Sequence, residues 1–150
     1  MLLLRSLYRV GGHLPPPVKR WIVQRREATF LVGVIGIVLD DDGRVMLFRH
    51  SYRPFAPWGL PSGCLRPGES LADSIVREVS EESGLRVEFE KILLVEAGSR
   101  PRRVDVWMRY RAIPGTSRPS AEVEEVAFFR LDELPPLIAE QERFLRDLPT

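Results

Sequence analysis

Three glutamates near the middle of the chain, Glu78, Glu81 and Glu82, have the spacing of side chains that share one helix face. At i, i+3 and i+4 their carboxylates lie within reach of one another and repel. A hard divalent cation would relieve this repulsion. Because all three are oxygen donors, with no histidine or cysteine among them, they indicate Mg²⁺ or Mn²⁺ rather than zinc. The alternative is an acidic helix face that contacts only solvent.

The neighbouring residues predict a helix over residues 70–83 that carries these glutamates. Ser70, followed three residues later by Asp73, resembles a capping-box start. Gly84 is typical of a helix end that turns left-handed. Between these ends, apolar residues recur at helical spacing and predict a buried stripe of Ala72, Ile75, Val76 and Val79. One helix of about four turns would therefore position all three carboxylates.

The stretch from Gly63 to Leu85 resembles the Nudix box, G-x5-E-x7-R-E-U-x-E-E-x-G-U, where U is a bulky aliphatic residue. Pro67-Gly68 predicts a turn inside it, next to Glu69. Just before the box, WGLPSG resembles the W-x-L-P-G-G of many relatives, with Ser62 in place of the first glycine of the pair. Every fixed position of the box is filled, by Gly63, Glu69, Arg77, Glu78, Val79, Glu81, Glu82, Gly84 and Leu85.

The resemblance implies a fold, an activity and a set of roles. The fold would be α+β, an α/β/α sandwich around a mixed β-sheet in a single domain. Glu78, Glu81 and Glu82 would bind Mg²⁺ or Mn²⁺, joined by a carbonyl at or before Gly63. Catalysis would fall to Glu78 and Glu82, assisted by Arg77, while Arg77 and Glu69 hold the loop and helix in place.

Members of this family often complete the metal site with one more acid, supplied after the central sheet. Glu122, at the junction of a loop and a strand, is our first candidate. Glu124 would share its strand face by alternation, and Glu125 would lie on the other face unless a β-bulge reverses them. The alternative is that all three are solvated charges that discourage edge pairing.

The sequence indicates the substrate-binding residues less clearly than the metal-binding ones. Tyr52 and Phe55 lie in an aromatic, proline-rich loop and could stack on a base. Arg49 and Arg53 could bind phosphate. Arg109 would do so if its face of an alternating strand looks into the cleft, whereas a solvent-facing polar side explains it equally well.

The rest of the chain fits the predicted sandwich. We expect strands at residues 29–39, 44–49, 87–97, 104–112 and 122–131, the first two forming a hairpin, and a last helix over 136–145. The apolar run 29–39 is typical of a strand buried on both faces. We divide the chain into an N-terminal extension, residues 1–27, helical and packed on the domain, and a Nudix hydrolase domain, residues 28–150.

Composition restricts the partners. The chain has 150 residues and a net charge of +1, which gives no electrostatic case for nucleic-acid binding. Its one cysteine, Cys64, fits a reducing cytoplasm. No stretch has the length and low charge of a membrane span. We expect a cytoplasmic enzyme, with homodimerisation possible.

The sequence therefore predicts a metal-dependent hydrolase that cleaves the diphosphate linkage of a small nucleotide. Nucleoside triphosphates, ADP-ribose and other nucleotide sugars all remain candidates, because the box does not encode the substrate. The competing hypothesis is a Nudix-fold module that binds a nucleotide or a protein partner without cleaving it.

Overall fold

The computed structural model describes residues 15–18, 29–98 and 102–148. The predicted N-terminal extension therefore lies outside the described residues, apart from residues 15–18. Its helical structure and its packing stay predictions. Residues from Leu31 onward group into one compact unit.

Strand β1, Leu31–Leu39, lies in the centre of the sheet and is buried on both faces. Val34 and Val38 face one hydrophobic core, and Ile35 and Ile37 face the other. This two-sided burial explains the continuous apolar run and confirms the interpretation of that run. Gly36 lets a helix approach closely, since a Cβ there would lie 2.6 Å from Ile75 Cγ2.

The sheet is mixed, as predicted, and the described residues form seven strands rather than the five expected. Along the main path the order is β3-β2-β1-β6-β5; β4 pairs with β1, and β7 pairs with β2. Strands β1 and β6 run parallel, whereas the other pairs are antiparallel. The remaining strands are β2 Val45–His50, β3 Trp58–Gly59, β4 Ser62–Cys64, β5 Arg86–Gly98, β6 Arg103–Ile113 and β7 Val123–Phe129.

The predicted hairpin between β1 and β2 is present only at its base, where Leu39 pairs with Val45. Beyond that point β1 pairs with β4 and β6, while β2 pairs with β7 and β3. The turn at Asp40–Gly43 reverses the chain as expected, but the two strands then diverge. The loop predicted over residues 50–62 contains the short strands that fill these places, β3 and the first residue of β4.

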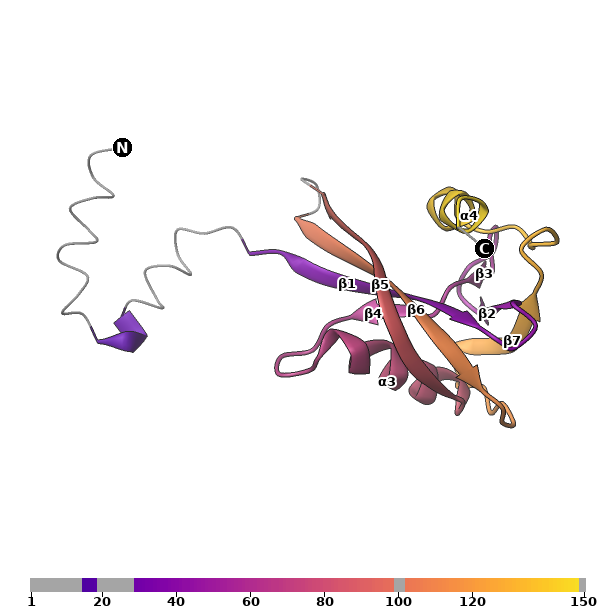
Figure 1. Cartoon of the computed structure of the whole chain (residues 1–150), viewed down its shortest axis with the longest axis horizontal. Helices are drawn as coiled ribbons and strands as arrows, with labels where there is room; N and C mark the ends of the chain where they lie inside the picture. Colours follow the sequence, from indigo (N-terminus) through magenta and orange to yellow (C-terminus); the bar gives the residue numbers. More distant parts are fainter. Residues whose placement is uncertain (1–14, 19–28, 99–101, 149–150) are drawn as a thin grey trace. The chain divides into compact units, whose positions relative to one another are not determined.

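Two helices cover opposite faces of the sheet (Figure 1). Helix α3, Leu71–Ser83, contributes Ile75 and Val79 to the core on one face. Helix α4, Ala139–Arg146, contributes Leu145 to the core on the other. This is the α/β/α sandwich that the sequence predicts. Helix α4 begins three residues later than expected, because Ile138 is still extended at its N-cap, with φ −65° and ψ 140°.

Candidate active site

Helix α3 has the ends that its sequence predicts. The backbone N–H of Asp73 donates to the Ser70 side chain at 3.1 Å, and Gly84 ends the helix with φ 69°. The predicted apolar stripe faces the core, where Ile75 and Val79 are fully buried. With the stripe fixed against the sheet, the positions of the three glutamates follow from the helix geometry.

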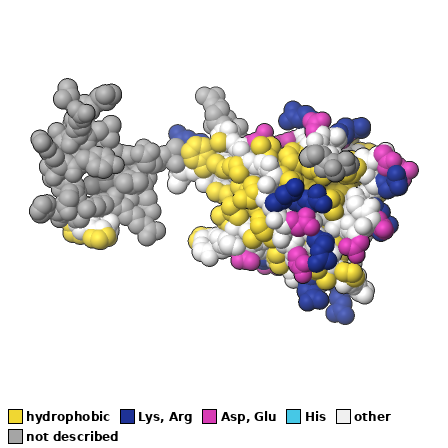
Figure 2. Space-filling view, in the orientation of Figure 1, with side chains coloured by type: hydrophobic (Ala, Val, Ile, Leu, Met, Phe, Trp, Pro, Cys, Tyr) yellow, Lys and Arg dark blue, Asp and Glu magenta, His cyan; other side chains and the backbone are white. Residues whose placement is uncertain are grey.

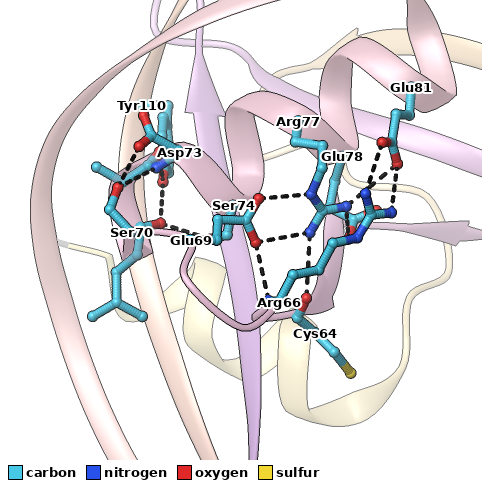
Figure 3. Close-up of polar contacts among 12 residues, drawn as sticks. Cys64, Arg66, Glu69, Ser70, Asp73, Ser74, Arg77, Glu78, Glu81 and Tyr110 are labelled. Atoms are coloured by element: carbon cyan, nitrogen blue, oxygen red, sulfur yellow. Dashed lines mark hydrogen bonds and ion pairs between the residues drawn. The ribbon is translucent and has the colours of Figure 1, made fainter.

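Arg77 is the centre of the polar network on this helix (Figure 3). Its guanidinium donates to both oxygens of Glu69, at 2.7 and 3.1 Å. It also donates to Glu78 Oε1 at 2.7 Å, to Glu81 Oε2 at 3.3 Å and to the carbonyl of Cys64 at 3.3 Å. Glu69 in turn accepts from the backbone N–H of Arg66, at 3.1 Å. One arginine thus ties the helix to the loop and to strand β4.

Gly63 lies directly beneath the carboxylate of Glu78. A Cβ at this position would overlap the Glu78 side chain, so only glycine lets strand β4 approach the helix this closely. The two residues that the resemblance assigns to one metal site are therefore neighbours in space. The side chain of Glu78 is only 14% exposed, which directs its carboxylate inward over the loop.

Glu81 has a different environment. Its side chain is 49% exposed and accepts two hydrogen bonds from Arg66, both at 3.1 Å. This bidentate pair is the strong form of an arginine–carboxylate contact. Arg66 occupies a variable position of the box, and our sequence analysis assigned it no role. In this conformation Arg66 and Arg77 together neutralise Glu81.

Glu82 is the most perturbed carboxylate. Its Oε2 atom is buried and has no hydrogen-bond partner in the part of the chain that the structure describes. Burial, followed by the negative charges of Glu78 and Glu122, raises the pKa of Glu82 to about 7. The positive charge of Arg53 partly opposes this rise.

These carboxylates fit a hard divalent cation by their donor chemistry and by their charge. The donors are all oxygen atoms. A cation would give Glu82 the partner that it lacks among the described residues, and its positive charge would offset the repulsion between Glu82 and Glu78. Within the described residues, no three carboxylate, histidine or cysteine side chains already converge as a ready-made metal cage. Arg66 and Arg77 occupy the carboxylates instead, so binding would require at least Glu81 to leave Arg66.

The three candidates for the additional metal-binding acid, Glu122, Glu124 and Glu125, have different environments. Glu122 precedes strand β7 and lies near enough to Glu82 to raise its pKa. Glu124 forms an ion pair with Arg49 at 2.6 Å. The β2–β7 register shifts beside Arg49, so a bulge does interrupt the alternation that we used for Glu122, Glu124 and Glu125. Of the three, Glu122 is the acid whose charge acts on the helix cluster.

The residues predicted to bind substrate do not form one group. Tyr52 and Phe55 are exposed, Phe55 almost completely, at 94%. Arg49 is engaged by Glu124, and Arg109 forms an ion pair with Glu90. Arg109 shares its strand face with Trp107, which packs in the core under helix α4. That face is opposite helix α3, so the structure does not bring Arg109 to the three glutamates.

Several residues of interest were absent from the sequence analysis. Gln141 is buried and accepts from the backbone N–H of Leu60 at 3.0 Å, across 81 residues of sequence. His50 is 5% exposed. A cavity of about 410 Å³ lies between helix α4 and strands β5 and β6, where Trp107 and Phe144 stack with ring centroids 4.2 Å apart. No local sequence pattern predicts these contacts, because each joins distant segments.

Comparisons with known proteins agree with this architecture. Residues 29–148 match the model of the NUDIX domain. The chain is 32% identical over 124 residues to a MutT-like protein of Streptomyces ambofaciens, covering 80% of this chain and 79% of that one. It is 28% identical over 121 residues to an ADP-ribose pyrophosphatase of Methanocaldococcus jannaschii, covering 77% and 71%. A solved ADP-ribose pyrophosphatase from Streptococcus suis superposes with a TM-score of 0.66 at 29% identity, covering 78% of this chain and 90% of that one.

Proposed function

The chain belongs to the Nudix hydrolase family, and from this premise we propose that it is a divalent-metal-dependent enzyme that cleaves the diphosphate linkage of a small nucleotide. The observation that carries the proposal is the carboxylate cluster of helix α3, with Glu78 over Gly63 and with the buried Oε2 of Glu82 lacking a partner among the described residues. A cluster of this kind is costly in a folded protein unless its charge is used.

Glu78, Glu81, Glu82 and a carbonyl near Gly63 would hold Mg²⁺ or Mn²⁺, with Glu122 as the additional acid. When bound, the metal neutralises the diphosphate and lowers the pKa of the attacking water. Arg77 and Glu69 keep helix α3 and the loop in register, so that the donors face one region. Glu78 or Glu82 accepts the proton of the water, as the resemblance to the family implies.

The substrate would be a nucleoside diphosphate linked to another group. Relatives named ADP-ribose pyrophosphatase support ADP-ribose as the first candidate, with nucleoside triphosphates and other nucleotide sugars next. Figure 2 shows basic and acidic side chains interspersed on the visible face of the domain, without a continuous basic patch. This mixture and the net charge of +1 favour a small molecule over RNA. None of the described helices has the length and hydropathy to cross a membrane.

A turnover assay tests this proposal directly. We expect hydrolysis of at least one member of a panel of ADP-ribose, nucleotide sugars, dinucleotides and nucleoside triphosphates in the presence of Mg²⁺ or Mn²⁺. A chelator should abolish it. Binding of a nucleotide without turnover, under all metal conditions, would contradict the proposal and favour a non-catalytic binding module.

Variants locate the activity. Glu78→Gln and Glu82→Gln keep the side-chain shape but remove a charge, and each should lower kcat by about 100-fold or more. Arg77→Ala should have a milder effect, about 10- to 100-fold, because Arg77 acts by orienting other residues. Glu133→Gln, an exposed change on the loop before helix α4, is the matched control. Near-normal turnover by Glu82→Gln would remove Glu82 from the mechanism.

A further inference from the structure

Two side chains, one at the end of strand β2 and one in the loop after it, have polar atoms without partners among the described residues. His50 is 5% exposed, yet neither of its ring nitrogens has a hydrogen-bond partner within residues 15–18, 29–98 and 102–148. Nη1 of Arg53 is also buried and unpartnered. Buried donors of this kind are uncommon, because each costs free energy unless something accepts its hydrogen bond. In the described part of the chain, Arg53 forms no ion pair, whereas Arg49, Arg66 and Arg77 each bind a carboxylate.

The two side chains meet above Gly59. A Cβ at Gly59 would lie 2.6 Å from Arg53 Nη1 and 3.5 Å from His50 Nε2, so these nitrogens are close to each other. The absence of a side chain at Gly59 is what lets the guanidinium lie against the backbone of strand β3. Gln141 approaches the same point and binds the N–H of Leu60 at 3.0 Å, which fixes this backbone from the side of helix α4.

The cluster lies beside the candidate acid Glu122, because His50 pairs with Val123 and the backbone N–H of Ser51 donates to the carbonyl of Glu122 at 3.2 Å. The positive charge of Arg53 acts on Glu82, because it opposes the rise in the pKa of that carboxylate. It acts on His50 as well: burial, and then Arg53, lowers the pKa of His50 to about 4. His50 is therefore neutral near pH 7 and offers one N–H donor without adding charge. Arg53 supplies the charge, next to a region that would hold metal.

We propose that Arg53 and His50 form an anion subsite that binds a phosphate group of the substrate beside the carboxylates of helix α3. The subsite rests on the proposed function, since the anion is one phosphate of the diphosphate that those carboxylates help to cleave. The buried Nη1–H of the Arg53 guanidinium and a neutral imidazole N–H, both without acceptors among the described residues, match the oxygens of one phosphate. Arg53 binds as a charged donor, and His50 as a neutral one.

Steady-state kinetics test the subsite on the best substrate of the panel. Arg53→Ala should raise KM by about 10- to 100-fold, the loss expected for a charged hydrogen bond. His50→Asn should raise KM by about 2- to 10-fold, as for a neutral one. Arg53→Lys, which keeps the charge but loses the planar fork, should fall between the wild type and Arg53→Ala. Arg130→Ala removes an exposed arginine that contacts Asp132 and should leave KM unchanged.

A binding measurement separates the subsite from turnover. We expect inorganic diphosphate, in a buffer with Mg²⁺, to raise the melting temperature of the wild type and of Arg130→Ala, and to raise that of Arg53→Ala less. An inactive wild type whose diphosphate shift depends on Arg53 would contradict the hydrolase proposal and support the subsite. Wild-type KM and wild-type diphosphate shifts in Arg53→Lys and His50→Asn would overturn the subsite, even if Arg53→Ala does not fold.

Discussion

The ionised carboxylate of Glu82 destabilises the folded protein. Its pKa of about 7 lies above the ordinary glutamate value of 4.5, so the folded protein binds this proton more tightly than the unfolded chain does. The resulting stabilisation is present below the ordinary pKa and is lost as the pH rises through about 7. At pH 8, without metal, the folded protein must hold a buried carboxylate beside Glu78 and Glu122.

Glu82→Gln should therefore stabilise the metal-free protein at pH 8, by about 1–2 kcal/mol once partial solvent exposure is taken into account. At pH 4 the gain should largely vanish, because the wild-type carboxyl is then protonated. Urea unfolding in a chelating buffer at both pH values measures this difference. Equal stability of the two proteins at pH 8 would mean that the carboxylate is not strained in the folded state.

Arg66 competes with a metal for Glu81, because both need the same carboxylate oxygens. Arg66→Ala should tighten the apparent affinity for Mg²⁺ by about threefold to tenfold, since it removes an exposed bidentate ion pair that competes with the metal. A Mg²⁺ titration followed by thermal melting gives the affinity. Arg44→Ala, in the turn between β1 and β2, is the control. Weaker Mg²⁺ binding by Arg66→Ala would indicate that Arg66 helps to assemble the site.

At the scale of elements, helix α4 holds the loop that leads into the box. Gln141→Leu preserves the size of the side chain but leaves the buried N–H of Leu60 without its acceptor. We expect a loss of about 1–3 kcal/mol in the free energy of unfolding. Glu140→Gln, an exposed change on the same helix, should cost little. Chemical denaturation distinguishes the two variants. A neutral Gln141→Leu would show that water satisfies Leu60 equally well.

Elements with strong local signals were predictable, and those defined by distant partners were not. The ends of helix α3 follow from Ser70 and Gly84, and the two-sided burial of β1 follows from its unbroken apolar run. Strand β3, two residues long, exists only because Trp58 and Gly59 pair with β2. Helix α4 starts late because Ile138 is still extended, next to Leu137, which packs into the core. The periodicity of the sequence predicts neither the presence of strand β3 nor the late start of helix α4.

At the scale of the whole molecule, the same division applies to the site. The box predicts its own internal contacts, such as Arg77 with Glu69 and Glu78 over Gly63, because the participating residues are close in sequence. It does not predict that Arg49 binds Glu124, 75 residues away, or that Arg53 and His50 meet above Gly59. These contacts depend on how β2, β3 and β7 associate.

The parallel pairing of β1 with β6 also sets an order of events during synthesis. Leu31 pairs with Arg103, so the central strand leaves the ribosome long before its parallel partner exists. Strand β4 and helix α3 can cover part of β1 early, but the opposite core requires helix α4, which follows all seven strands in the described part of the chain. Until then the nascent chain exposes one apolar side of its most hydrophobic strand. Contacts this distant in sequence slow folding, and the unfinished chain is the form most prone to aggregation.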